Sequence, residues 1–240
     1  MKLDKRPVKP CLFVGPSRRE LKAFPDDVKG SIGYALHQAQ CGEEPDSAKA
    51  LKGFGGRGIL EIVDDFDGNT YRAVYTVRFA GVIYVLHAFQ KKSTKGIATP
   101  KHTIDLIKSA PAGRRSGLPR TTEARREAMT TRRPKVEKGS GNIFADLGLP
   151  DAEDMLLKSN IVIELRRLMT QRKLTQTAAA KLVGVSQADL SKILRGHFRG
   201  YSEAKLMRML TAFGQDVEIT TRPRRKSGEA GRIIFSPHAA

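Results

Sequence analysis

Tryptophan is absent from this chain of 240 residues, and cysteine occurs only twice, at Cys11 and Cys41. Two cysteines are too few for a disulfide framework or a cysteine-based metal site. No stretch of about 18 apolar residues is available to span a membrane, and the charged first residues lack the apolar core of a signal peptide. We therefore expect a protein of the reducing cytoplasm, with no membrane partner, no metal and no cofactor.

Acidic residues are also in short supply. The sequence has 43 lysines and arginines against 25 aspartates and glutamates, a net charge of +18 at pH 7. Such an excess attracts polyanions through long-range forces and the release of counterions. An anionic membrane surface fits the charge as well, but nothing else in the sequence indicates a membrane. The charge therefore favours nucleic acid as the partner.

Residues 1–110 have the pattern of an α+β domain. Apolar residues recur at helical spacing after Pro25, and from residue 59 the pattern changes to the alternation of strands. Two helices, a three-stranded antiparallel meander and a final helix are predicted. The expected elements are a short helix with a capping box at Ser17 and Glu20, a helix with Val28, Ile32, Leu36 and Ala39 on one face, strands at Ile59–Val63, Tyr71–Phe79 and Val82–Phe89, a turn at Asp67-Gly68-Asn69, and a helix from Thr99 to about Ser109.

Residues 111–138 are rich in arginine, proline and glycine and show no usable period. The stretch 113–138 alone carries nine basic residues against three acidic ones. This composition predicts a flexible basic linker. Residues 139–240 have helical periods and predict an all-α domain, which ends in a short strand at Val217–Thr220 that pairs with residues 232–235.

A motif in residues 174–196 predicts a helix-turn-helix. Ala179 and Ala180 are small enough for two helices to approach closely. Gly184 permits a turn with positive φ, and Ser186 caps the next helix. The apolar residues of that helix pack inward and leave its other face for a DNA major groove. An ordinary three-helix bundle is the alternative. The candidate DNA-binding residues are Gln176, Ser186, Gln187, Ala188, Ser191, Lys192 and Arg195.

This motif closely resembles lambda-repressor-like domains of the xenobiotic-response-element (XRE) class. With residues 141–148, 195–202 and 213–219 included, the resemblance extends to HigA-type antitoxins of toxin–antitoxin modules, over about residues 129–225. It implies a homodimer that binds operator DNA and represses its own promoter. The residues assigned by the resemblance are Gln187, Ser191 and Lys192 to base edges or nearby phosphates, and Gln176 and Arg195 to backbone phosphate. Asp189 departs from this, since DNA repels a carboxylate unless it faces away or accepts from cytosine.

Cationic residues are the candidate chemistry of the first segment. The glycine-rich run at residues 53–58 formally fits a dinucleotide fingerprint, but it opens a strand instead of a helix, so we reject it. Taken singly, a strand histidine is more often structural and a lysine pair more often solvated. Together at one end of a sheet, such residues form a phosphate-binding surface. The candidate catalytic residues are Arg72, His87, Lys91, Lys92 and Lys95.

Residues 52–54, 71–75 and 83–92, followed by Thr99-Pro100, resemble a RelE/HigB-superfamily toxin of the phage-derived kind. The similarity covers about residues 8–108. The family implies metal-free cleavage of mRNA, commonly on the translating ribosome, in which the RNA 2′-hydroxyl attacks the adjacent phosphorus. The implied roles are phosphate binding for Arg72, charge stabilisation for Lys92 with Lys91 or Lys95, and proton transfer for His87.

Two departures from the RelE pattern are visible. Glu61 and Val63 stand where the best-known RelE enzymes have lysines, and no matching tyrosine is found near the last helix of this segment. A reading-frame change just upstream of Met129, a natural read-through or a deliberate fusion would each explain the junction between the two halves.

The whole sequence therefore predicts a toxin–antitoxin module in one chain, with a toxin-like domain at 1–110, a linker at 111–138 and an antitoxin-like domain at 139–240. The second domain would mask the basic surface of the first, in cis or in trans. Two alternatives stay open. One is a DNA-binding regulator whose first domain is catalytically inactive, and the other is a free ribonuclease with a nucleic-acid-targeting tail.

Overall fold

The computed structural model describes residues 8–51, 58–77, 81–91, 135–221, 231 and 233–236. These residues form two compact units whose boundaries differ from the segments seen in the sequence. The sheet unit holds the described residues within 9–24 and 47–141, and the helical unit holds Val8 and those within 25–46 and from 142 onward. The chain thus passes between the two units more than once.

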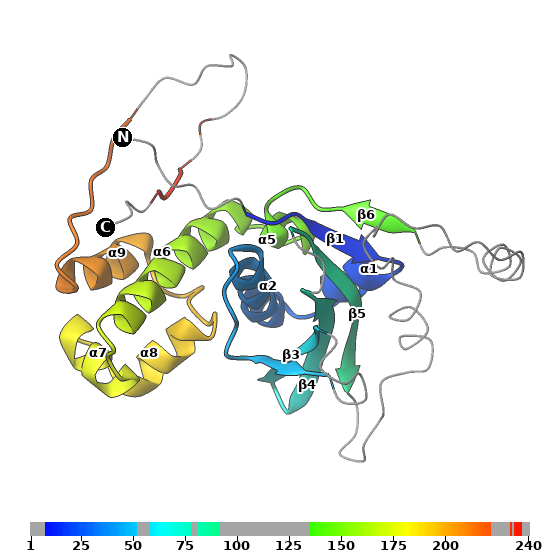
Figure 1. Ribbon diagram of the computed structural model, residues 1–240, viewed down its shortest axis with the longest axis horizontal. Helices are drawn as coiled ribbons and strands as arrows, with labels where there is room; N and C mark the ends of the chain where they lie inside the picture. The colour runs from blue at the N-terminus through cyan, green and yellow to red at the C-terminus, as the bar shows by residue number, and fades with distance from the viewer. Residues whose placement is uncertain are drawn as a thin grey trace, which may run out of the picture. The chain divides into compact units, whose positions relative to one another are not determined.

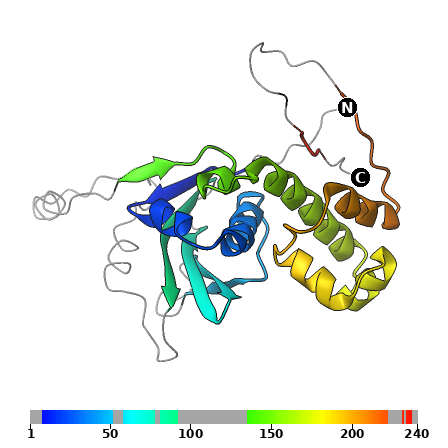
Figure 2. The same ribbon diagram turned by 180° about the vertical axis from the view of Figure 1, so that it is seen from behind.

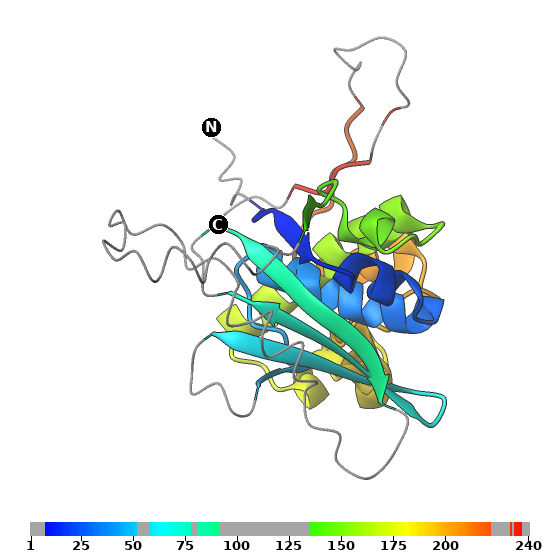
Figure 3. The ribbon, with the colours of Figure 1, turned by 90° about the vertical axis from the view of Figure 1, so that its right-hand side faces the viewer.

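The sheet unit is built on six strands in the order β2-β3-β4-β5-β1-β6, with only β1 and β5 parallel (Figure 3). The predicted meander of β3, β4 and β5 is confirmed. Its first turn, Asp67-Gly68, has φ of 49° and 71°, the two-residue turn that suits the twist of a hairpin. The strands are β1 (Cys11–Val14), β2 (Ala48–Ala50), β3 (Ile59–Phe66), β4 (Asn69–Thr76), β5 (Ile83–Lys91) and β6 (Val136–Lys138).

Strand β6 corrects the prediction of a linker that runs to residue 138. It pairs antiparallel with β1 (Figure 2). In addition, Gly15 N donates to the Lys135 carbonyl. Three residues are too few to show a period, so the strand is defined only by its distant partner. Residues 111–134 and the helix predicted from Thr99 lie outside the described residues.

Helix α1 (Ser17–Lys22) follows β1, but the predicted capping box is wrong. The Ser17 side chain is buried, and its hydroxyl donates to the Val85 carbonyl of β5 at 3.0 Å. A buried hydroxyl needs a partner, and here the neighbouring strand supplies it in place of the helix terminus. Glu20, the other residue of the predicted capping box, contacts β5 instead of the start of α1.

The helical unit consists of six helices in the described part of the chain (Figure 1). The predicted inward face of α8 is confirmed, since Leu190 and Ile193 are fully buried, and Phe213 at the end of α9 is fully buried as well. The helices are α2 (Asp26–Gln40), α5 (Ile143–Asp146), α6 (Ala152–Gln171), α7 (Gln176–Val183), α8 (Gln187–Leu194) and α9 (Glu203–Ala212).

The strand predicted at Val217–Thr220 is wrong. These residues, and residues 233–236, belong to no strand, and Ile219 is 79% exposed. A strand forms only where a partner accepts its hydrogen bonds. All six strands of the described residues belong to the sheet unit. Residues 217–220 therefore have no partner strand, despite their β propensity.

Helix α2 comes from the first segment of the sequence but packs within the helical unit. Its predicted apolar face is confirmed as buried, and polar residues such as His37 and Gln38 are buried as well. Glycines let α5 and α6 approach closely. A Cβ on Gly33 would lie 2.9 Å from Cε1 of Phe144, and one on Gly30 would lie 3.2 Å from Cε of Met155.

Polar contacts fix the position of α2 along α6. His37 Nε2 and Asn160 Oδ1 are hydrogen-bonded at 2.8 Å. Just beyond α2, Asp46 accepts two hydrogen bonds from the Arg166 guanidinium, at 2.6 and 2.8 Å. These directional contacts specify one register between the two helices, which apolar packing alone leaves less defined.

The glycine at position 33 provides a test of this packing. Gly33→Ala pushes a methyl group into the buried Phe144 ring, and we expect a loss of about 1–3 kcal/mol in the free energy of unfolding. The gain in helix propensity, about 1 kcal/mol, offsets only the lower end of this range. Gly30→Ala is the matched control, because its methyl group meets only the flexible end of Met155. Thermal denaturation that ranks the two variants as equally stable would contradict the close approach.

The buried histidine predicts a pH dependence of stability. Burial lowers the pKa of His37, so the folded protein keeps the ring neutral. The unfolded chain takes up a proton as the pH falls through about 6.5, which lowers the free energy of unfolding. Between about pH 7.5 and 5.5 we expect the melting temperature to fall more for the wild type than for His37→Gln. Parallel curves for the two proteins would show that His37 is not the cause.

Candidate nucleic-acid surfaces

The first candidate surface is the outer face of α8. Thr175 caps α7, Gly184 ends it with a φ of 72°, and Ser186 caps α8 by accepting from the Asp189 amide. Ala179 and Ala180, where the two helices meet, are buried. Each of these local features agrees with the predicted helix-turn-helix.

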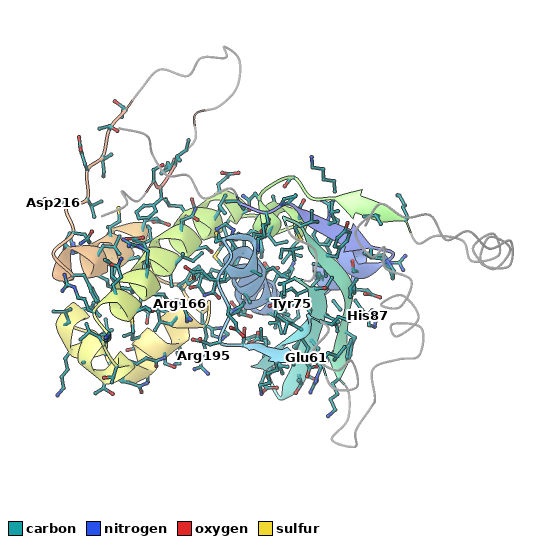
Figure 4. The ribbon with its side chains drawn as sticks, viewed as in Figure 1. Glu61, Tyr75, His87, Arg166, Arg195 and Asp216 are labelled. Carbon is teal, nitrogen blue, oxygen red and sulfur yellow. The ribbon has the colours of Figure 1, made fainter. Side chains whose placement is uncertain are left out.

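Most of the candidate DNA-binding residues are exposed to solvent. Ser186, Gln187, Ala188, Lys192 and Arg195 are exposed, and Gln176 and Ser191 are half-buried. Figure 4 shows Arg195 at the end of α8. Its Nε donates to the Ser191 carbonyl at 3.2 Å, so the side chain lies along its own helix.

Two glutamines on this surface are hydrogen-bonded to each other. Gln187 Nε2 donates to Gln176 Oε1 at 3.1 Å and joins the first turns of α7 and α8. The bond orients both amides before any ligand arrives. Polar groups held in advance lose less conformational entropy on binding.

The carboxylate of Asp189 is held by the helix cap. Ser186 Oγ donates to Asp189 Oδ2 at 2.7 Å and accepts from the Asp189 amide at 3.0 Å. The negative charge therefore lies at the positive end of the α8 dipole, which stabilises it. The Ser186 hydroxyl is engaged in the same cap.

The second candidate surface is one face of the sheet. Val74 lies opposite Glu61 on one side and His87 on the other, and Arg72 lies opposite Phe89. Opposite and alternate residues share a face, so Arg72, His87 and Glu61 lie on the same one. Lys91 is opposite Thr70 and belongs to it as well.

Arg72 is engaged with a carboxylate on this face. Its Nη1 donates to Glu61 Oε2 at 2.6 Å, and the two side chains are 25% and 15% exposed. The Nε atom of Arg72 is buried and has no hydrogen-bond acceptor among the described residues. The guanidinium thus retains donor capacity beyond the ion pair.

His87 is engaged with a second carboxylate, Glu20 of α1. Its Nδ1 and Glu20 Oε2 are 2.8 Å apart, and the same oxygen accepts from Ala88 N at 3.0 Å. The imidazole stacks on Phe89, with centroids 5.2 Å apart. When the neutral ring donates its Nδ1–H to Glu20, the other ring nitrogen, Nε2, carries the lone pair.

Lys92 and Lys95, the other two candidate catalytic residues, lie outside the described residues. Across the described ranges, no three His, Cys, Asp or Glu side chains gather as a possible metal site. The described helices also include none that is long and apolar enough to cross a membrane.

Comparisons with known proteins assign both halves of the chain. Residues 19–110 match a family described as "Phage derived protein Gp49-like", and residues 143–222 match a helix-turn-helix domain family. The chain joins a phage-derived Gp49-like domain, of the RelE/HigB toxin type, to an XRE-type helix-turn-helix domain. The predicted resemblances to a phage-derived toxin-like family and to an XRE-type helix-turn-helix are thereby confirmed.

A solved structure also matches the chain. It is named "Putative XRE Family Transcriptional Regulator" and is 35% identical over 36% of this chain and 97% of that one, with a TM-score of 0.34. A comparison with curated proteins found no significant match.

The Gp49-like domain contains two functional candidates whose partnerships sequence reasoning missed, Glu20 and Glu61. Glu61 was detectable in principle. A two-residue turn at Asp67-Gly68 sets Glu61 opposite Val74, which brings it to the face of Arg72. No comparable signal existed for Glu20, because its contact with β5 depends on how α1 packs.

Proposed function

We propose that this chain is a toxin–antitoxin module in a single polypeptide, whose helix-turn-helix domain binds operator DNA and represses its own promoter. The observation that carries the proposal is the outer face of α8. Its polar and cationic side chains are exposed, and its apolar side chains are buried beneath. An α-helix capped at both ends and presented in this way fits a major groove.

The assigned contacts follow from residue chemistry. Gln187, held by Gln176, presents an amide suited to the edge of adenine. Lys192 and Ser191 lie one turn further along α8 and reach bases or nearby phosphates. The net charge of +18 supplies the salt-dependent attraction to the DNA backbone.

A homodimer is the form expected to bind. Two copies related by a twofold axis place two α8 helices about 34 Å apart, in successive major grooves of a palindromic site. The proposed compartment is the cytoplasm, where operator DNA and mRNA are both present.

Lys192→Ala tests the role of α8. We expect it to weaken binding to a duplex that the wild-type chain selects from a random-sequence library, by about 1–3 kcal/mol. Arg208→Ala removes the same charge from the exposed surface of α9 and serves as the control. Titrations followed by fluorescence anisotropy compare the three proteins. Equal affinities would remove α8 from the DNA interface, and failure to select any duplex would exclude specific DNA binding.

The second proposed activity is metal-free cleavage of mRNA, associated with the ribosome. The observation that favours it is the gathering of Arg72, His87 and Lys91 on one face of the sheet. In the reaction, the 2′-oxygen bonds to phosphorus and the bond to the 5′-oxygen breaks. Arg72 binds the phosphate, and Lys92, with Lys91 or Lys95, offsets the negative charge that develops. His87 accepts the proton of the 2′-hydroxyl at Nε2, and that proton is returned to the 5′-oxygen that leaves.

One carboxylate on this face, that of Glu61, opposes the activity. Glu61 occupies a guanidinium edge of Arg72 that a phosphate needs, and it repels an approaching phosphate. Glu20 has a different effect, since it orients His87. The Gp49-like domain therefore has the groups for phosphate binding, with its central arginine restrained by Glu61.

Glu61→Gln tests whether the restrained face cleaves RNA. Removing the competing charge should raise mRNA cleavage in growing cells, by about tenfold if one ion pair has to break. The control is the double variant with Arg72→Ala as well, which leaves no unpaired charge at the site. Mapping of RNA 5′ ends should show cleavage by the single variant and none by the double. If both are as inert as an empty vector, releasing Arg72 from Glu61 does not produce cleavage, which contradicts the proposed restraint.

A further inference from the structure

The turn that follows the recognition helix is rigidly joined to it. Gly196 N donates to the Ile193 carbonyl at 3.0 Å, and His197 N donates to the Lys192 carbonyl at 3.0 Å. Gly196 has a φ of 99°, which favours glycine. The last turn of α8, with Lys192 and Arg195, therefore moves together with the segment 196–198.

That segment lies directly on α2. A Cβ built on Gly196 would be 3.0 Å from the Cα of Ser31 and 3.0 Å from the Cβ of Tyr34. The contact is thus between the backbone of the turn and the backbone of the helix. No side chain larger than a hydrogen atom fits between them without moving one of the two.

A ring pair completes the contact. Phe198 is fully buried and meets Tyr34 edge-on, with centroids 5.2 Å apart and planes at 88°. Tyr34 itself is 1% exposed, and its hydroxyl has no hydrogen-bond partner among the described residues. The ring therefore contributes shape and contact area, and the hydroxyl contributes little.

A second anchor lies one residue further along. The Arg199 guanidinium donates to Asp151, at the start of α6, at 2.8 and 3.2 Å. It also lies 3.4 Å from a carboxylate oxygen of Asp26, in the first turn of α2. Residues 196–199 are thus held on α2 at two points.

We propose that Tyr34 of α2 is a positioning residue for DNA recognition: it holds the turn at Gly196 and Phe198 and thereby sets the angle of α8. Helix α2 belongs to the stretch matched by the Gp49-like family, not to the helix-turn-helix match. The DNA-reading unit is therefore completed by a helix of the toxin-like domain. This inference rests on the proposed DNA binding.

A coupling between the two domains follows. Base recognition requires each side chain to meet its base edge within the narrow geometry of a hydrogen bond, whereas phosphate attraction tolerates a small tilt. Displacement of α2 should therefore lower specific binding more than non-specific binding. A ligand that pulls α2 away would release the operator, by the reciprocity of linked equilibria.

The test compares Tyr34→Ala with Tyr34→Phe in the full chain, using the selected duplex and a duplex of scrambled sequence. We expect Tyr34→Ala to reduce the ratio of specific to non-specific affinity by about tenfold, the size of one or two lost base contacts. Tyr34→Phe keeps the ring and should retain the wild-type ratio. A protein that is merely less folded would lose both affinities in parallel and leave the ratio unchanged, which would overturn the inference.

Substitutions at two glycines test the same contact without changing Tyr34. Gly196→Ala and Gly214→Ala both place alanine at positive φ, but only the first meets the backbone of α2, since the nearest atom to the second is in Arg172 at 3.7 Å. We expect the affinity ratio to fall only for Gly196→Ala. Equal ratios in these two variants would also overturn the inference. If the wild-type chain selects no duplex at all, the proposed function fails, and the positioning role fails with it.

Discussion

The close seating of α2 on the helices that follow residue 142 is the constraint on which the helical unit depends. Gly33 against Phe144 and Gly196 against Tyr34 bring main chains and rings to contact distances that no larger residue allows. Packed interiors tolerate little change of volume, so these contacts have few substitutes. The paired groups His37 and Asn160 then select one register. A helix of the Gp49-like domain is for this reason a structural part of the helix-turn-helix unit.

The two candidate surfaces differ in their electrostatic state. On α8, Lys192 is exposed. Asp189 is the only carboxylate among the described residues of that helix, and Ser186 holds it in the cap. On the sheet, Arg72 is paired with Glu61, and His87 is hydrogen-bonded to Glu20. One surface is ready for a polyanion, whereas the other must first release a carboxylate from its arginine. This difference is why the structure supports DNA binding more directly than RNA cleavage.

Sequence reasoning succeeded where short-range physics decides the outcome. Thr175, Gly184 and Ser186 specify caps and a turn within a few residues of themselves, so the helix-turn-helix was predictable. The predicted turn at Asp67-Gly68 likewise connects β3 and β4, although sequence reasoning did not draw from it that Glu61 lies on the face of Arg72. The capping box at Ser17 failed because burial beside β5 gave its hydroxyl a different acceptor. The strand at Val217–Thr220 failed because β propensity requires a partner strand.

By itself, the sequence determined the two families, the periods of the long helices and strands, and the outward residues of α8, because each depends on side chains a few positions apart. Only the tertiary structure decided that β6 completes the sheet through β1, that α2 joins the helices of the other domain, and that Glu20 and Glu61 engage His87 and Arg72. Those features link residues that are distant along the chain. Their energies come from packing and charge pairing, which exist only once the chain has folded.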